Sequence, residues 1–114
     1  MVTVNDICRA LFDAAPEYMK MDWDNVGLMC GWADSAVTRV LVSLDATMDA
    51  LEEARQNGCE LVVSHHPMIF GGIKSVTSET ATGKDLLFAI QNGISVISMH
   101  TNLDCAHGGV NDVL

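Results

Sequence analysis

The sequence predicts an α/β fold whose core is a sheet of parallel strands joined by crossover helices. Three short apolar runs, at residues 40–44, 61–64 and 94–99, have the length and β-branched content of buried strands. Two stretches of helical length, residues 47–57 and 80–91, lie between them. This alternation predicts right-handed crossovers between parallel neighbours.

Composition predicts a single α/β domain over residues 1–114. Hydrophobic residues make up 49% of the chain and charged residues 18%, which is typical of a globular protein. No apolar run approaches eighteen residues, and residues 1–6 lack the basic start and apolar centre of a signal peptide. We therefore expect a cytoplasmic protein with no membrane partner.

Charge excludes one class of partner and favours another. The net charge is −9, with 15 acidic and 6 basic residues, so the chain lacks the basic footprint of a nucleic-acid-binding protein. An anionic substrate would need a cation, and a bound divalent metal could supply it.

The four cysteines form no CxxC pair, and we expect reduced, packed thiols. Cys105, beside Asp104, could be a ligand or a reactive thiol, but packing is the preferred interpretation.

The first part of the chain predicts a covering helix followed by turns. Thr3 is a good N-cap, apolar residues recur at helical spacing up to residue 14, and Pro16 ends the pattern. Residues 21–31 combine turn-forming side chains with two glycines, which allow the backbone to approach a neighbour closely.

The remaining elements follow in order. The first core strand is expected at residues 37–44 and ends at Asp45, and Gly58 stops the helix that follows. The second strand ends at His65 and His66, because Pro67 cannot continue a ladder. The third strand runs into His100.

Polar side chains follow all three predicted core strands. Since parallel strands present their carboxyl ends at one edge, the following residues should converge there: Asp45, His65, His66, His100 and Asp104. Imidazoles with carboxylates suit zinc, iron, manganese or nickel. For each histidine alone, packing or solvation is the alternative, and we expect His107 to be an exposed loop residue.

Three motifs together resemble one known family. They are residues 23–28 (WDNVGL), residues 64–67 (SHHP), and residues 98–104 (SMHTNLD) followed by residues 108–112 (GGVND). In this order they resemble the GTP cyclohydrolase 1 type 2 homologues, the Nif-three-like dinuclear metal proteins. The resemblance covers nearly the whole chain. It implies an α/β fold with two divalent metals at its centre and subunits assembled as hexameric rings.

The resemblance also implies roles for individual residues. His65 and His66 would be metal ligands, one mainly for each ion, and Asp104 a further ligand. His100 and Asn102 would lie in the pocket, with His100 the candidate for catalytic proton transfer. Members of the family are usually more than twice as long and supply a later histidine and glutamate in an HxxxE motif. We therefore expect this chain to be the N-terminal part of such a fold, to bind at most one metal weakly, and to self-associate.

The function expected from these observations is metal-dependent hydrolysis of a small, nucleotide-like substrate. A divalent metal that lowers the pKa of water would allow attack on a purine ring carbon or a phosphate ester. The alternatives are a nucleotide phosphatase and a metal-binding or partner-binding scaffold without turnover. The sequence leaves the metal and the substrate open.

Overall fold

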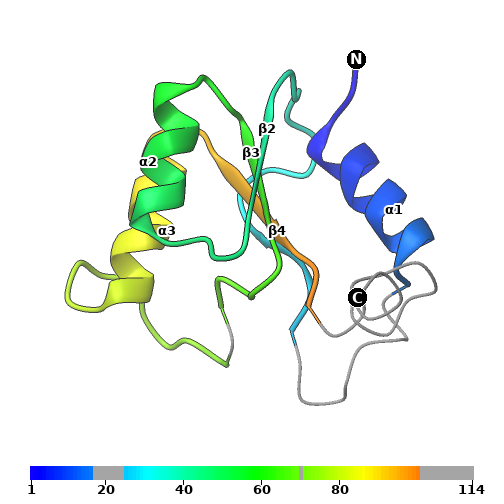
Figure 1. The fold of residues 1–114 in the computed structure, drawn as a ribbon. Coiled ribbons are helices and arrows are strands. Elements are labelled where there is room, and N and C mark those ends of the chain that lie inside the picture. Colours follow the sequence, from blue (N-terminus) through cyan, green and yellow to red (C-terminus); the bar gives the residue numbers. More distant parts are fainter. Residues whose placement is uncertain (17–24, 70, 101–114) are drawn as a thin grey trace.

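The computed structural model describes residues 1–16, 25–69 and 71–100, which form a four-stranded sheet with helices on both faces (Figure 1). The strands lie in the order β1-β4-β3-β2. In chain order the elements are α1 (Val4–Ala14), β1 (Gly27–Cys30), β2 (Val40–Ser43), α2 (Met48–Gln56), β3 (Leu61–Ser64), α3 (Ala81–Gln91) and β4 (Ser95–Ser98).

The predicted parallel core is confirmed. β2 pairs with β3 and β3 pairs with β4, both in parallel, so that Ser43, Ser64 and Ser98 lie side by side at the strand ends. The crossover helices α2 and α3 cover one face of the sheet, and α1 covers the other (Figure 1). All four residues of β4 are buried, as expected for a strand with neighbours on both edges and helices on both faces.

The sheet is mixed, because β1 joins it as a fourth strand. β1 runs antiparallel to β4, whereas turns were predicted for this segment. Gly27 and Gly31 do have positive φ angles, +108° and +112°, but the residues between them form a strand. A Cβ on Gly31 would lie 2.1 Å from Ser95 Oγ, so glycine is what allows β1 to lie this close to β4.

β2 begins later than the predicted residue 37. The carboxylate of Glu60 accepts hydrogen bonds from the backbone N–H groups of Thr38 (2.7 Å) and Arg39 (3.1 Å). Val37 N–H donates to the Val2 carbonyl (2.8 Å). The N–H groups of residues 37–39 are therefore already hydrogen-bonded to groups outside β3. The pairing of β2 with β3 starts only at residue 40, which makes the strand shorter than predicted.

α1 begins and ends where predicted, and it closes one of two apolar layers. Thr3 Oγ1 accepts from Asp6 N–H, and the Asp6 carboxylate accepts from Thr3 N–H, which completes a capping box. Val4 packs with Leu61 and Ile97 beneath this helix.

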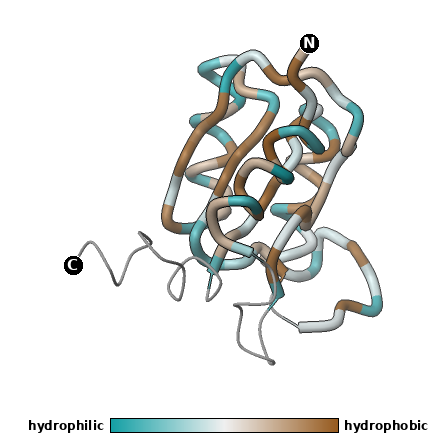
Figure 2. Tube along the Cα trace, turned by 90° about the vertical axis from the view of Figure 1, so that its right-hand side faces the viewer, coloured by the Kyte–Doolittle hydropathy of each residue, from teal (hydrophilic) through white to brown (hydrophobic). Residues whose placement is uncertain are grey.

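The second apolar layer lies between the sheet and the pair α2 and α3. It is built from fully buried aliphatic residues such as Leu51, Val62 and Val96. Brown stretches of the chain trace in Figure 2 mark such hydrophobic segments. Among the helices that the structure describes, none is long and apolar enough to cross a membrane.

Candidate metal centre

Serines at the ends of the parallel strands fix the loop that carries two histidines. Ser64 Oγ donates to the His66 carbonyl (2.9 Å), and Ser98 Oγ accepts from Met68 N–H (3.3 Å). The two hydroxyls are 2.9 Å apart and nearly inaccessible to solvent. Because an N–H only donates and a carbonyl only accepts, Ser98 must donate to Ser64, and the chain of hydrogen bonds runs in one direction. The recurrence of serine at all three strand ends was visible in the sequence, although its role was not predicted.

Asn25 holds the far side of the same loop. Its side-chain amide donates to the carbonyl of Ile69, 2.8 Å away and 44 positions along the chain. We predicted a local turn at Asp24 and Asn25; Asp24 lies outside the described residues, and this long-range contact of Asn25 was missed. The loop after β3 is therefore tied to β4 at one end and to the residues preceding β1 at the other.

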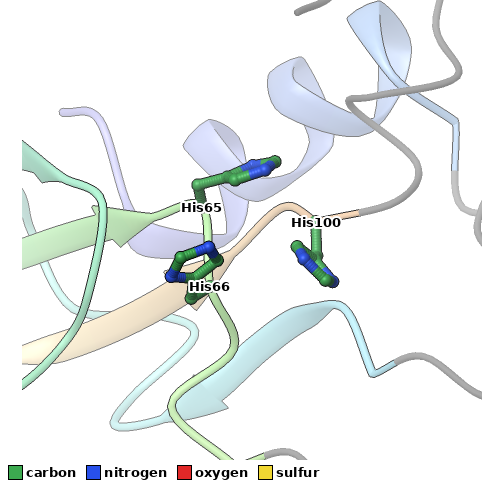
Figure 3. Close-up of side chains that lie close together, drawn as sticks. All are labelled: His65, His66 and His100. Carbon is green, nitrogen blue, oxygen red and sulfur yellow. The ribbon is translucent and has the colours of Figure 1, made fainter.

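Three imidazoles meet at the carboxyl ends of β3 and β4. His65, His66 and His100 have ring centroids 5.0–5.6 Å apart (Figure 3). One ring nitrogen from each lies within 4.8 Å of the others. The predicted convergence of these residues is confirmed, although they come from two strand ends separated by a crossover helix.

The donor set fits a divalent transition metal. Imidazole nitrogen is a good ligand for zinc, iron and nickel. Zinc–nitrogen bonds of about 2.1 Å place two ligands of one ion at most about 4.2 Å apart. Small side-chain rotations would therefore bring ring nitrogens of this group close enough to share one ion.

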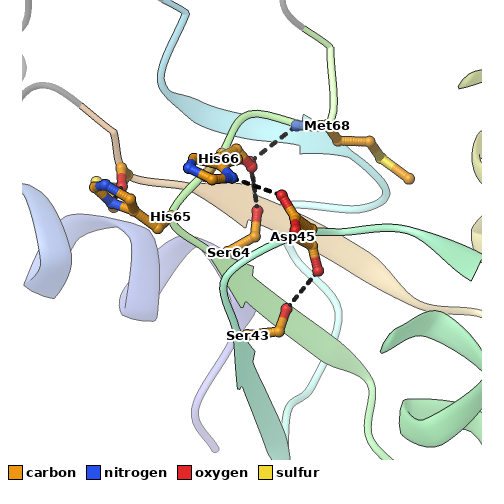
Figure 4. A network of polar contacts seen from close by, with 8 residues as sticks. Ser43, Asp45, Ser64, His65, His66 and Met68 are labelled. Atoms are coloured by element: carbon orange, nitrogen blue, oxygen red, sulfur yellow. Dashed lines mark hydrogen bonds and ion pairs between the residues drawn. The ribbon is translucent and has the colours of Figure 1, made fainter. Parts of the chain in front are cut away.

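The imidazoles of His65 and His66 both make a hydrogen bond to the protein through Nδ1. The Nδ1 atom of His65 is 2.9 Å from the Met99 carbonyl oxygen, and that of His66 is 2.6 Å from Asp45 Oδ1 (Figure 4). A carbonyl and a carboxylate accept hydrogen bonds, so each Nδ1 is the donor. Nε2 is then the nitrogen with which either ring would bind a metal. The predicted place of Asp45 at this edge is confirmed.

Several predicted site residues lie outside the described part of the chain. They are Asn102, Asp104, Cys105 and His107. The roles assigned to them stay predictions. Within the described residues, Cys30 is buried and Cys8 and Cys59 are half-buried. Burial raises the pKa of the Cys30 thiol, which agrees with a packed, unreactive side chain.

An apolar cavity of about 260 Å³ adjoins His65. Leu11 and Ala15 line it from α1 and the residue after it, and Val42 and Val63 line it from β2 and β3. This volume is below the roughly 300–1,000 Å³ of sites for drug-sized ligands. The cavity is large enough for a single ring.

Comparison with known sequences gives one consistent result. Residues 2–114 match the model of the Duf34/NIF3 (NGG1p interacting factor 3) family. The chain is 40% identical over 111 residues to a protein named GTP cyclohydrolase 1 type 2 homolog from Clostridium acetobutylicum, covering 97% of this chain and 41% of that protein. It is 42% identical over 113 residues to one of the same name from Staphylococcus aureus, covering 97% and 30%. The chain thus spans about two fifths or less of these relatives.

Comparison with solved structures identifies the same fold. A Bacillus cereus protein related to NIF3 superposes with a TM-score of 0.91 at 35% identity, covering 98% of this chain and 31% of that one. Reduced HcgD from Methanocaldococcus jannaschii superposes with a TM-score of 0.89 at 28% identity, covering 97% and 44%.

Proposed function

The chain belongs to the Duf34/NIF3 family, and from this premise we propose that it binds divalent metal and contributes to the metal-dependent hydrolysis of a small, nucleotide-like substrate. The observation that carries the proposal is the meeting of His65, His66 and His100 at the carboxyl edge of the parallel strands. Two of these imidazoles, His65 and His66, have Nδ1 engaged by an acceptor, which is the arrangement expected of metal ligands.

Each residue has a distinct proposed role. His65 and His66 hold metal through Nε2, and Asp104 supplies a carboxylate. His100 moves a proton to or from the substrate, as the third imidazole of the group. A divalent ion in this position would supply Lewis acidity, which acidifies water and polarises a carbonyl or phosphoryl oxygen. The resemblance described above implies two ions in a complete site.

The substrate is proposed from charge and from the relatives' name. The chain carries a net charge of −9, so an anionic substrate would be attracted by the bound cation rather than by the protein. The name GTP cyclohydrolase 1 type 2 homolog points to a purine nucleotide. The apolar cavity beside His65 could accept a ring-sized part of such a molecule.

Metal analysis followed by product analysis tests the proposal. The purified chain is loaded with zinc or manganese, its metal content is measured, and GTP loss, formate release and phosphate release are assayed. His65→Ala serves as the metal-site control. Formate release supports ring hydrolysis, phosphate release alone supports a phosphatase, and bound metal without turnover supports a scaffold. A wild-type chain that binds no metal in a direct titration would refute the proposal in all three forms.

Self-association is proposed as well, up to the hexamer that the resemblance implies. The outer strand β2 and the residue after it expose large apolar side chains, with Val40 at 40%, Val42 at 76% and Leu44 at 59% of full exposure. Exposed apolar patches of this kind are typical of interaction surfaces. Mass photometry of the purified chain gives the oligomeric state, and a strictly monomeric protein would contradict the expectation.

The cytoplasmic location remains a prediction, to be checked by cell fractionation.

A further inference from the structure

The carboxylate of Asp45 contacts the ring edge of His66 that faces away from Nε2. Asp45 Oδ1 lies 2.6 Å from His66 Nδ1, a short hydrogen bond of the kind that a charged acceptor favours. The two side chains are about half exposed, at 52% for Asp45 and 47% for His66. An ionised carboxylate can only accept, so the Nδ1 atom of His66 carries the proton.

The backbone holds this pair in place. His66 N–H donates to the Leu44 carbonyl (2.8 Å), which continues the pairing of β2 and β3 past their ends. Ser43 Oγ donates to the backbone carbonyl of Asp45 (2.7 Å) and fixes the turn that presents the carboxylate (Figure 4). Asp45 and His66 therefore meet because two parallel strands leave the sheet side by side.

His65 offers an internal comparison. Its Nδ1 donates to the Met99 carbonyl, a backbone acceptor at the exit of β4. Of the two neighbouring imidazoles, His66 is thus the one whose proton position depends on a side chain that can be mutated without disturbing a strand.

We propose that Asp45 is a positioning residue for the metal centre: by accepting the Nδ1 proton of His66, it holds this ring in the tautomer that presents Nε2 to the ion. This inference rests on the proposed metal-binding function and extends it to a residue that need not touch the metal. Carboxylates in this position fix ring orientation and raise ligand basicity, and their loss costs about 10–100-fold in metal affinity. The competing role is direct ligation by Asp45. Within the described residues, the group whose ligand atoms lie within 4.8 Å comprises the three histidines and not Asp45.

Nuclear magnetic resonance of the metal-free chain tests the hydrogen bond separately from metal binding. With ¹⁵N-labelled histidine at about pH 8.5, where free imidazole is neutral, long-range ¹H–¹⁵N spectra report the tautomer of each ring. We expect the Nδ1–H form for His66 in the wild type and a shift towards the Nε2–H form in Asp45→Ala. His65 should keep its Nδ1–H form in both proteins, which also reports that the variant is folded.

Zinc titration by competition with a chelator completes the experiment. Asp45→Ala should bind zinc about 10–100-fold more weakly. Asp45→Asn has a side chain of the same shape whose amide can either accept from Nδ1 or donate to it, so it should retain the Nδ1–H form and the zinc affinity only in part. The control is Asp49→Ala, which removes the same charge from the exposed first turn of α2 and should leave both readouts unchanged.

Several results would overturn the inference. An Nε2–H tautomer of His66 in the wild type would refute the hydrogen bond, as would no change in Asp45→Ala. Loss of zinc affinity without a change of tautomer would assign Asp45 to direct ligation. A change of tautomer without loss of affinity would show that it has no influence on the metal. A wild-type chain with the expected tautomers that binds no zinc would refute the metal centre itself, and with it any role of Asp45 toward a metal, while the hydrogen bond would stand.

Discussion

Replacing Gly31 with alanine should destabilise the fold through two additive effects. The backbone at Gly31 has φ +112°, a conformation that costs other residues about 1–3 kcal/mol. The added Cβ would also lie 2.1 Å from Ser95 Oγ and 2.6 Å from Ser95 Cα, so β1 and β4 must move apart. Overpacking of this kind costs about 1–3 kcal/mol. The expected loss in the free energy of unfolding is therefore about 2–6 kcal/mol.

Gly58→Ala is the matched control for the backbone effect. Gly58 follows α2 with φ +69°, and a Cβ there would have no atom within 4 Å. Its substitution should cost only the left-handed penalty, about 1–2 kcal/mol. Urea unfolding of the three proteins, followed by circular dichroism, gives both differences. If Gly31→Ala costs no more than Gly58→Ala, the close approach of β1 to β4 is not a source of strain and the reasoning fails.

Two further predictions concern acid stability and metal content. The backbone N–H groups of Thr38, which has the largest effect, and of Arg39 donate hydrogen bonds to Glu60 and lower the pKa of its carboxyl. The stability that the ionised Glu60 adds is therefore complete at neutral pH. It is lost as pH falls below the ordinary pKa of about 4.3 and through the lowered one. Glu60→Gln should cost about 1–2 kcal/mol at neutral pH and flatten the acid dependence of the urea midpoint; an unchanged acid slope would contradict this. His65→Ala and Asp104→Ala should each lower zinc content sharply, whereas Cys105→Ala should not, as measured by elemental analysis. Full occupancy in Asp104→Ala would remove that residue from the ligand set.

The parallel core could be predicted because its signals are local. Each strand is a short apolar run bounded by turn residues, and each connection has a helical pattern, so topology followed from chain order. β1 could not be predicted in this way. Its four residues begin with one glycine and are followed by another, both typical of turns, and its partner β4 is more than sixty positions away. The strand exists because of a tertiary contact that glycine permits.

At the candidate site, too, one part could be predicted from the sequence and another could not. The meeting of His65, His66 and His100 followed from the rule that parallel strands share a carboxyl edge. The contact of Asp45 with His66, and the different acceptor chosen by His65, depend on side-chain directions at the strand exits, which spacing does not specify. The carboxylate of Asp104 remains a prediction because it lies outside the described residues.

The hydrogen bonds made by Ser64 and Ser98 at the ends of β3 and β4 have a consequence for hydrogen exchange. Met68 N–H is bonded to a hydroxyl that is nearly inaccessible, and Met99 N–H donates to the Ser64 carbonyl (2.9 Å). The Met99 amide reaches solvent only when the ends of β3 and β4 separate, and the Met68 amide only when its loop leaves Ser98. Loop amides usually exchange through small local openings, but the Met99 amide should exchange only in the larger openings that also expose the core strands. The backbone at the exit of β4, directly before His100, would then exchange together with the core strands.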